Sequence, residues 1–386
     1  MIETTDDLAQ LCGRLVRHPH VAVDTEFMRE TTYWPHLCVV QLAAGGEAAL
    51  IDARAPGLDL APLFELLRAP GSVKVFHAGR QDLEIFYHLG RVLPTPLFDT
   101  QVAAMVCGFG DQVGYDKLMR DLLKVHIDKG TQYTDWYRRP LSERQVRYAL
   151  DDVIYLESAY ELLTERLRAS GRERWVDEEM AVLAEPTTYL MPVEEAWRRL
   201  KSRSQNRRYL AILREVTAWR ETEARTRDIP RNRVLRDDVL TAIAAEAPET
   251  PDQLGRVRAV PKSFPERAEG AALIAAVRRA KALPEREMPV PDAIVDLPRG
   301  LGPIVDLLKV VLKLKAEEAG VAQKLIANGD DLDRIALDDA ADVPALKGWR
   351  RHLFGADALA VKHGKLALAA DGRQLRLVAV NGSNVA

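Results

Sequence analysis

The chain has 386 residues and a formal net charge of −3 at pH 7, and 47% of its residues are hydrophobic. This length predicts two or three domains with packed cores. Three scattered cysteines and the lack of a long apolar run exclude a disulfide framework, a cysteine zinc cluster and a membrane span, so we expect a cytoplasmic protein without a membrane partner.

The first half of the chain alternates strand and helix patterns. Apolar periodicity predicts strands at 21–27, 38–43, 48–52 and 73–77, and helices at 60–67, 79–89, 100–105, 115–123 and 142–168. In this order three strands come before the first helix. Consecutive strands with short connections pair antiparallel, and strands separated by helices pair parallel, so we expect a mixed sheet covered by helices.

Acidic residues occur in three of these segments. Asp24 and Glu26 are two residues apart in the strand VAVDTEF, so both project from one face. Asp82 stands at the start of a helix in FHAGRQDLEIF. Tyr148 and Asp152 are four residues apart in VRYALDDVIYL and share one helix face. Each fragment alone is compatible with a turn or a helix cap, and their joint occurrence indicates a site.

The chemistry of this set is that of phosphodiester hydrolysis. Four converging carboxylates would repel one another, and a pair of Mg²⁺ or Mn²⁺ ions about 3.5–4 Å apart would balance them, activate a water molecule and stabilise the leaving oxygen. A tyrosine ionises near pH ~10, so Tyr148 is suited to orient the water rather than to remove its proton.

Two longer stretches narrow the interpretation. The order DTE, HAGRQD and Y-x3-D resembles the signature of the DEDDy 3′–5′ exonucleases. FDTQVAAMVCGFGDQVGYDKL from Phe98 and TQYTDWYRRPLSERQVRYALDDVIYL from Thr131 are similar to the ribonuclease D family. The resemblance covers residues 1–180 best, and it implies a ribonuclease H-like α/β exonuclease domain there.

The resemblance also implies the roles of the site residues and the reaction. It implies two catalytic divalent ions, Mg²⁺ or Mn²⁺, with Tyr148 positioning the nucleophile and with these metal ligands: Asp24, which bridges the ions, Glu26, Asp82 and Asp152. The implied reaction removes 3′-terminal nucleotides from RNA as 5′-monophosphates. Precursors of transfer RNA and other small structured RNAs are the implied substrates, and we expect a monomer.

The region after the exonuclease domain is strongly basic. Residues 198–236 contain 13 Lys and Arg against 4 Asp and Glu. Such an excess favours a polyanionic partner, because a bound phosphate backbone releases counterions. Trp197, Tyr209 and Trp219 could stack on bases or belong to a core, and we leave both possibilities open. The residues predicted to bind RNA phosphates are Arg138, Arg139, Arg207 and Arg208.

Two small all-α domains are expected to follow the exonuclease domain. Residues 205–285, with the core LREVTAWRETEARTRDIPRNRVLRDDVLTAIA, resemble the helicase-and-RNase-D C-terminal (HRDC) domain. A second, weaker copy is expected at 300–375, where LLKVVLKLKAEEAGVAQKLIANGDDLDRIA occupies the corresponding place. The linker at 284–303, with five prolines, is expected to be extended.

Two other functions are compatible with the residues. A general or DNA-directed DEDDy exonuclease would carry the same five site residues, because nothing in the motif recognises a ribose 2′-hydroxyl. A non-catalytic RNA-binding scaffold would keep the fold, although the intact acidic set argues against it. A helicase motor is not supported, because the chain has no Gly-x4-Gly-Lys-Ser/Thr loop.

Overall fold

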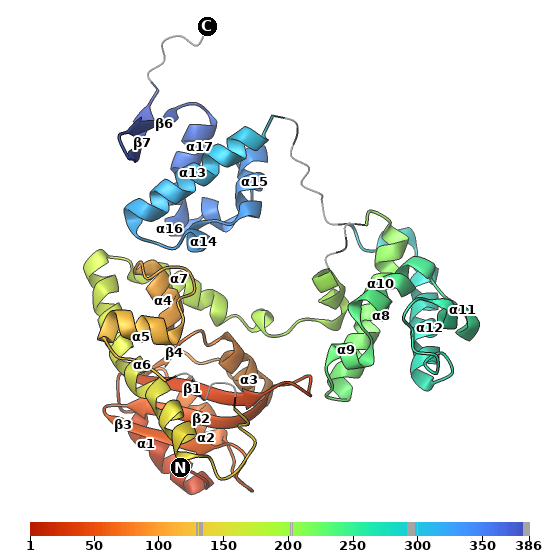
Figure 1. Cartoon of the computed structure of the whole chain (residues 1–386), viewed down its shortest axis with the longest axis horizontal. Coiled ribbons are helices and arrows are strands. Elements are labelled where there is room, and N and C mark those ends of the chain that lie inside the picture. Colours follow the sequence, from red (N-terminus) through yellow and green to blue (C-terminus); the bar gives the residue numbers. More distant parts are fainter. Residues whose placement is uncertain are drawn as a thin grey trace. The chain divides into compact units, whose positions relative to one another are not determined.

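The described residues form two compact units. The computed structural model describes residues 1–128, 130, 134–200, 202, 204–291, 298 and 300–380, and residues 292–297 and 299 of the predicted linker lie outside them. The first unit comprises Met1–Glu26, Val39–Glu185 and Val295–Ala386. The second comprises Phe27–Cys38 and Pro186–Ile294. Figure 1 labels their elements along the chain.

A five-stranded sheet is the centre of the first unit. Its strands are β1 (His20–Met28), β2 (His36–Ala44), β3 (Glu47–Asp52), β4 (Val73–Phe76) and β5 (Leu97–Asp99). Their spatial order is β3-β2-β1-β4-β5, and Figure 1 labels the first four of these strands. The pair β2 and β3 is antiparallel, whereas β1, β4 and β5 run parallel. The predicted mixed sheet is therefore confirmed.

Seven helices accompany this sheet among the described residues before residue 186. They are α1 (Thr5–Leu15), α2 (Ala61–Arg68), α3 (Arg80–Gly90), α4 (Thr100–Val106), α5 (Tyr115–Leu123), α6 (Glu143–Ser170) and α7 (Glu173–Leu183). The expectation that three strands precede the first helix was wrong, because α1 comes first. The Thr4 side chain caps α1 by accepting from the backbone N–H of Asp7, and Leu8, Leu11 and Leu15 bury one face.

The C-terminal part of the first unit is mainly helical. It contains α13 (Gly302–Ala319), α14 (Gln323–Ile326), α15 (Gly329–Leu337), η4 (Pro344–Leu346), α16 (Gly348–Arg350), a π-helical turn (Arg351–Gly355) and α17 (Ala356–Lys362). A long helix, a helix of 4 residues and one of 9 follow one another here. The second unit repeats this succession with 20, 4 and 10 residues, which fits a duplicated module.

An all-α domain was expected in this C-terminal region, but the structure also contains two strands there. β6 (Leu366–Asp371) and β7 (Gln374–Ala379) form an antiparallel hairpin. Its signal is the alternating run LALAAD and the Asp371-Gly372 pair. Gly372 has φ +61°, which suits the first central position of a primed two-residue turn.

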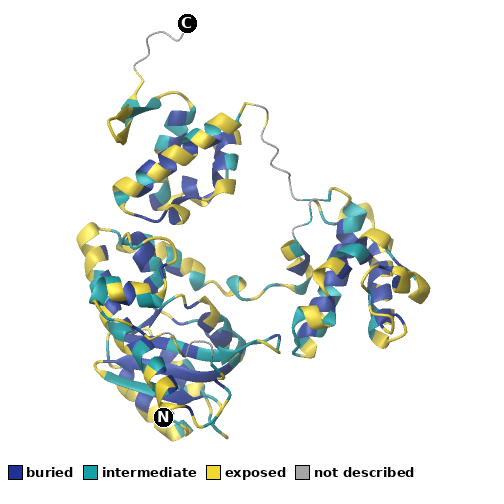
Figure 2. Ribbon diagram, in the orientation of Figure 1, coloured by how far each residue is buried: buried dark blue, intermediate teal, exposed yellow. Residues whose placement is uncertain are grey.

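The exonuclease part and the C-terminal helices share one apolar core. Figure 2 shows buried residues on both. The side chains of Ala103 on α4, Leu163 on α6 and Val176 on α7 join one cluster with those of Leu308 on α13 and Phe354. The rings of Trp175 and Trp349 stack with centroids 4.3 Å apart. Residues 300–380 therefore belong to the first compact unit and pack against the exonuclease part.

The second unit has a helical core of its own. It contains η1 (Pro186–Thr188), η2 (Val193–Leu200), α8 (Arg207–Thr226), α9 (Arg231–Val234), α10 (Asp237–Glu246), α11 (Pro251–Arg256), α12 (Ala268–Ala282) and η3 (Glu285–Glu287). Trp197 is buried in this core, and Tyr209 and Trp219 pack against it. The three aromatic residues therefore have structural contacts. Among the described residues, no helix has the length and hydrophobicity needed to cross a bilayer.

Candidate active site

The topology of the sheet brings the acidic segments together. Asp24 and Glu26 lie toward the carboxyl end of β1. β4 runs parallel to β1 and leads directly into α3, which carries Asp82 in its first turn. Because the carboxyl ends of parallel strands meet at one sheet edge, the first turn of α3 lies beside the end of β1.

Helix α6 supplies the remaining two predicted residues. Val153 and Leu156 of α6 pack on Ala22 of β1, so the helix lies over the sheet face that carries Asp24. Carboxylate oxygens of Asp24, Glu26 and Asp152 lie within 4.8 Å of one another. Among the described residues, this is the one cluster of three or more potential metal ligands, and the distances between its oxygens suit a shared metal ion.

Asp82 is held beside this group by a residue that sequence reasoning missed. The Thr25 hydroxyl, between Asp24 and Glu26 in the chain, donates a hydrogen bond to Asp82. Both side chains are buried. Burial and the charge of Asp24 raise the pKa of Asp82 well above its usual value. Thr25 thus connects β1 with α3, and its place inside the DTE motif was the available signal.

The other three carboxyl groups also resist ionisation. Burial, the largest cause, raises the pKa of Asp24 to about 7. Burial and then the charges of Asp24, Asp152 and Asp82 raise the pKa of Glu26 to about 10. Burial and the charge of Asp24 raise the pKa of Asp152 to about 8. Without a compensating cation, the cluster therefore binds protons at neutral pH.

Tyr148 is a hydrogen-bond donor in this site. Burial and the negative charges of Asp152, Glu26 and Asp24 raise the pKa of its hydroxyl far above the usual value. The hydroxyl hydrogen-bonds to Asp152, one helical turn further along α6. A phenol with a raised pKa keeps its proton, so Tyr148 cannot act as a base at neutral pH.

Asp99 fixes the backbone around α3 and was not recognised from the sequence. This buried carboxylate, at the end of β5, accepts hydrogen bonds from the backbone N–H groups of Ala78 at 3.1 Å and Gly79 at 2.9 Å. It also caps α4 through the N–H of Gln101 at 2.8 Å. A Cβ at Gly79 would approach the Phe76 Cβ to 2.6 Å, so the turn into α3 requires glycine.

Gln41 is a further buried polar residue on the active-site face. It lies in β2 with 0% exposure, and neither atom of its amide has a hydrogen-bond partner among the described residues. Ala43 projects from the same strand face and packs with Ala22 and Val153. Gln41 therefore lies on the sheet face that carries Asp24.

His77 was left outside the predicted catalytic set, with substrate binding and helix capping as alternatives. The imidazole is partly buried, and its Nδ1 lies 3.0 Å from the Thr100 hydroxyl. Its ring contacts Tyr115 edge to face. Burial lowers its pKa, so the imidazole is neutral at pH 7. It links the end of β4 to α4 and α5.

The two arginines of the WYRRP segment differ in their surroundings. Arg139 forms an ion pair with Asp52 at 2.6 Å and donates to the Trp136 carbonyl at 2.7 Å. Arg138 is exposed. The two residues are adjacent in sequence, and only the structure distinguishes the guanidinium group with a carboxylate partner from the exposed one. Their contact with RNA stays a prediction.

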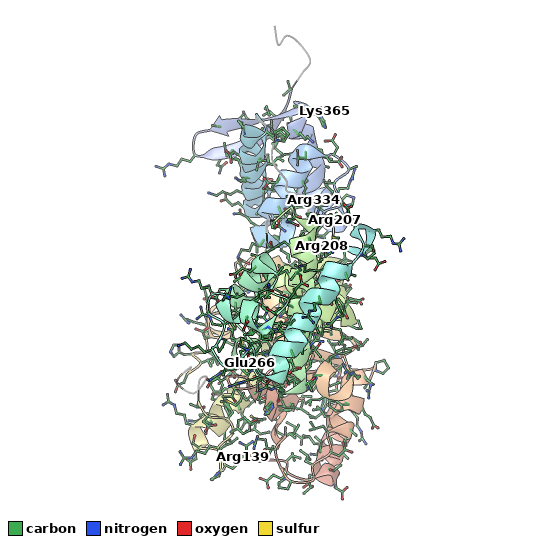
Figure 3. The ribbon with its side chains drawn as sticks, turned by 90° about the vertical axis from the view of Figure 1, so that its right-hand side faces the viewer. Arg139, Arg207, Arg208, Glu266, Arg334 and Lys365 are labelled. Carbon is green, nitrogen blue, oxygen red and sulfur yellow. The ribbon has the colours of Figure 1, made fainter. Side chains whose placement is uncertain are left out.

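Arg207 and Arg208 are engaged with backbone carbonyls. Arg208 Nη1 donates to three carbonyl oxygens at the end of α12, at 2.9–3.0 Å. Arg207 donates to carbonyl oxygens of residues 285, 288 and 289. Figure 3 labels both residues together with Arg139. These contacts hold the start of α8 to the end of α12, and RNA binding by the two arginines stays a prediction.

The residues present fit divalent cations. The donors are carboxylate oxygens, which hard cations prefer. Among the described residues, the causes that shift the pKa values of Asp24, Glu26 and Asp152 include no lysine or arginine, so this part of the chain offers their charges no counterion. A cation would supply the missing positive charge.

Comparisons with known proteins agree with this geometry. Residues 1–168 match the family model described as 3′–5′ exonuclease, and residues 209–277 match the HRDC domain. The crystal structure of Escherichia coli RNase D is similar with a TM-score of 0.82 at 33% identity, over 94% of this chain and 97% of that one. The fold and the matched domains define a 3′–5′ exonuclease with a ribonuclease H-like domain and helical C-terminal domains.

Full-length relatives identify the family. The chain is 51% identical to ribonuclease D of Granulibacter bethesdensis over 379 residues, which are 98% of this chain and 96% of that protein. It is 50% identical to ribonuclease D of Gluconacetobacter diazotrophicus over 378 residues, again 98% and 96% of the two chains. The chain belongs to the ribonuclease D family, and it is a 3′–5′ exoribonuclease, a hydrolase that acts on RNA.

Proposed function

We propose that the acid cluster is the catalytic centre of this exoribonuclease and that Asp24, Glu26, Asp82 and Asp152 hold two divalent ions, Mg²⁺ or Mn²⁺. The observation that supports this most directly is the approach of the Asp24, Glu26 and Asp152 carboxylates to within 4.8 Å. Asp82 lies outside this group of three, and it accepts a hydrogen bond from the hydroxyl of Thr25, the residue between Asp24 and Glu26. When bound, the ions would compensate the carboxylate charges and activate water for attack on the terminal phosphodiester.

The protein's own residues orient the reactants. Tyr148 keeps its proton and donates it to Asp152, one helical turn away, so the phenol oxygen can accept a hydrogen bond from the attacking water. Asp99 and Gly79 fix the first turn of α3, which holds Asp82 in position. A rigid arrangement of this kind lowers the entropy cost of bringing water and phosphate together.

We further propose that the substrates are small structured RNAs with short 3′ extensions, including transfer RNA precursors. The Escherichia coli relative is described as an exoribonuclease involved in structured RNA processing. The excess of basic residues at 198–236 supports a polyanionic substrate. We propose that the protein acts as a monomer, with functional domains at 1–180, 205–285 and 300–375.

Degradation of a 5′-labelled single-stranded RNA and of its DNA counterpart, resolved at the 3′ end, tests the proposal. The reactions contain Mg²⁺, Mn²⁺ or chelator. Asp152→Asn is compared with Asp151→Asn, because the neighbouring Asp151 is only partly buried and lies outside the cluster. Asp24→Asn is a second test of the cluster.

We expect a ladder of single-nucleotide steps on RNA that chelator, Asp24→Asn and Asp152→Asn abolish and that Asp151→Asn leaves in place. Equal losses for Asp151→Asn and Asp152→Asn would contradict the assignment of the site. Full activity in chelator would contradict the metal requirement, and equal rates on DNA would favour the alternative of a general DEDDy exonuclease.

A further inference from the structure

The second unit contains an arginine-rich cavity that the active-site chemistry does not explain. Its volume is about 410 Å³. The lining comes from the segment after β1, from η2, and from α8 to α10. It consists of Arg29, Thr32, Tyr33, Arg199, Leu200, Arg220, Pro230, Arg231, Asn232 and Asp237.

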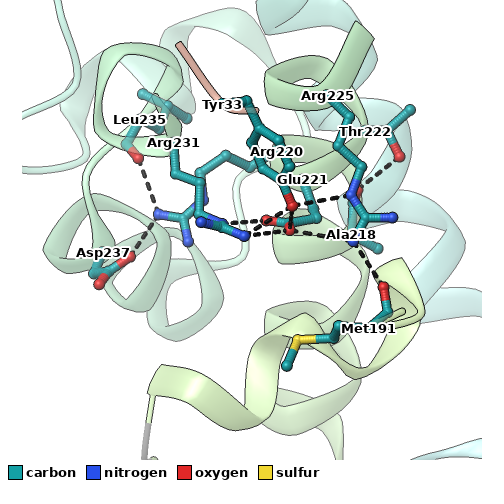
Figure 4. Close-up of polar contacts among 10 residues, drawn as sticks. All are labelled: Tyr33, Met191, Ala218, Arg220, Glu221, Thr222, Arg225, Arg231, Leu235 and Asp237. Carbon is teal, nitrogen blue, oxygen red and sulfur yellow. Dashed lines mark hydrogen bonds and ion pairs between the residues drawn. The ribbon is translucent and has the colours of Figure 1, made fainter. Parts of the chain in front are cut away.

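One wall of the cavity is a buried ion cluster, drawn in Figure 4. Glu221 accepts from Arg231 Nε at 2.6 Å and from Arg225 at 3.4 Å, and the Tyr33 hydroxyl also donates to it. The Glu221 side chain is 1% exposed. Burial opposes its ionisation, but Arg231, Tyr33 and Arg225 outweigh that effect and lower its pKa to about 2. The single charge of Glu221 is thus shared by two arginines.

Arg220 forms a second wall. Its residue exposure is 3%, and its Nη1 donates to the Leu235 carbonyl at 3.0 Å and to Asp237 at 2.5 Å. Its Nε is buried and has no hydrogen-bond partner among the described residues. The buried Arg220 guanidinium therefore contributes its positive charge to the cavity wall, where Asp237 is its carboxylate partner.

The lining has a net positive charge even when Glu221, the partner of Arg231, and Asp237, the partner of Arg220, are both counted. Four arginines line it, whereas Asp237 is the one carboxylate among the lining residues. The Asp237 side chain is 63% exposed, so solvent screens much of its charge. Arg199 is exposed and within reach of solvent ligands. Asn232 and Thr32 add neutral hydrogen-bonding groups to the same lining.

We propose that this cavity is a phosphate-binding site that takes a backbone phosphate of the RNA substrate. Arginine guanidinium groups match the geometry of phosphate oxygens and bind them through paired N–H donors. The site rests on the proposed function, because it requires RNA as the ligand. It adds a contact made by residues other than the acid cluster and other than Arg207 and Arg208.

Equilibrium binding of a labelled single-stranded oligouridylate to the full chain tests the site. Binding is measured in chelator over a series of salt concentrations, so the proposed metal-dependent cleavage does not remove the probe. Arg199→Gln removes a positive charge from the lining, and Asn232→Asp adds a negative one. Arg258→Gln is the matched control, because Arg258 is exposed in the same unit and does not line the cavity.

We expect both cavity variants to bind the oligonucleotide more weakly than wild type. For Arg199→Gln, the slope of log K against log salt should become less negative by about 0.7 for one lost phosphate contact on a single strand. Arg258→Gln should bind like wild type. Affinities and slopes equal to wild type for both cavity variants would overturn the proposal, as would an equal loss for Arg258→Gln.

Inorganic phosphate is the second probe. Phosphate should compete with the oligonucleotide for binding to the wild-type chain. Weaker competition in the Arg199→Gln variant would support the site. Binding of phosphate at the cavity with no effect on RNA affinity would overturn the assignment to the RNA backbone. Hydrolysis by wild type in Mg²⁺ is measured in parallel. Its absence would refute the proposed function, whereas the binding result would refute only the cavity.

Discussion

Glu26→Gln should stabilise the metal-free chain, although it removes a residue of the proposed catalytic centre. The pKa of Glu26 is raised to about 10, against an ordinary value of 4.5. A carboxyl group with a raised folded-state pKa contributes its full stability below the unfolded pKa and loses it as the pH rises toward the folded pKa. The free energy of unfolding of the metal-free protein should therefore decrease from pH 4.5 upward.

The size of the effect follows from the pKa values. At pH 7 the folded chain still holds a proton that the unfolded chain has released, and each pH unit above the unfolded pKa costs about 1.4 kcal/mol. The resulting loss in the free energy of unfolding is about 3 kcal/mol at pH 7 and about 1 kcal/mol or less at pH 5. A glutamine has no proton to hold. Because neighbouring carboxyl groups also bind protons, we expect a gain of about 1–3 kcal/mol at pH 7.

Scanning calorimetry of the full chain in chelator at pH 5 and pH 8 measures this effect. Glu65→Gln is the control, because Glu65 is an exposed residue of α2 with the same chemical change. The Glu26→Gln transition should occur at a higher temperature than wild type at pH 8 and differ little at pH 5. Added Mg²⁺ should raise the wild-type transition more than that of the variant, since binding to the folded state stabilises it. A Glu26→Gln variant no more stable than wild type at pH 8 in chelator would refute the reasoning.

Three other substitutions test different parts of the molecule. Tyr148→Phe removes the hydroxyl proposed to orient water, so single-turnover cleavage should slow by about 10²-fold while Mg²⁺ affinity, measured by titration, stays near wild type. Lys74→Met removes a buried ammonium group bonded to three backbone carbonyls at 2.5–2.7 Å, and it should lower the free energy of unfolding by at least about 2 kcal/mol in urea denaturation. Trp349→Ala removes a buried ring stacked on Trp175 and should lower the free energy of unfolding by about 3–5 kcal/mol. Calorimetry and faster proteolysis of the C-terminal helices would detect this loss. An unchanged thermal transition would contradict the shared core.

Local periodicity was sufficient to predict which site residues of the exonuclease domain share a face of a strand or helix. A strand period of two places Asp24 and Glu26 on one face, and a helical period of 3.6 places Tyr148 and Asp152 on one face. Each depends on residues a few positions apart, so the sequence was sufficient. The predicted helix at 115–123 agrees with α5 (Tyr115–Leu123) at both ends. The missed helix α1 carried an ordinary capping and burial pattern, so its omission was an error of interpretation.

The sequence could not decide which basic side chains are available to a ligand. Arg138 and Arg139 are neighbours in the chain, yet Asp52, far away in sequence, engages Arg139 alone. The carbonyls that hold Arg208 lie 72–75 residues further along. Such contacts depend on which distant backbone groups the fold leaves without partners, and no local period encodes them.

The assembly of the site and of the core also required tertiary structure. Asp82 reaches Asp24 because β4 lies parallel to β1, and the Thr25 hydroxyl that holds it is 57 residues away in the chain. The C-terminal helices pack in one core with α4 and α7, which lie far away in the chain. The sequence by itself thus determined the kind of chemistry, a carboxylate site suited to divalent ions, through residue types and local periods. Strand order and packing between distant segments decided which side chains meet in that site. Those contacts depend on the fold of the whole chain.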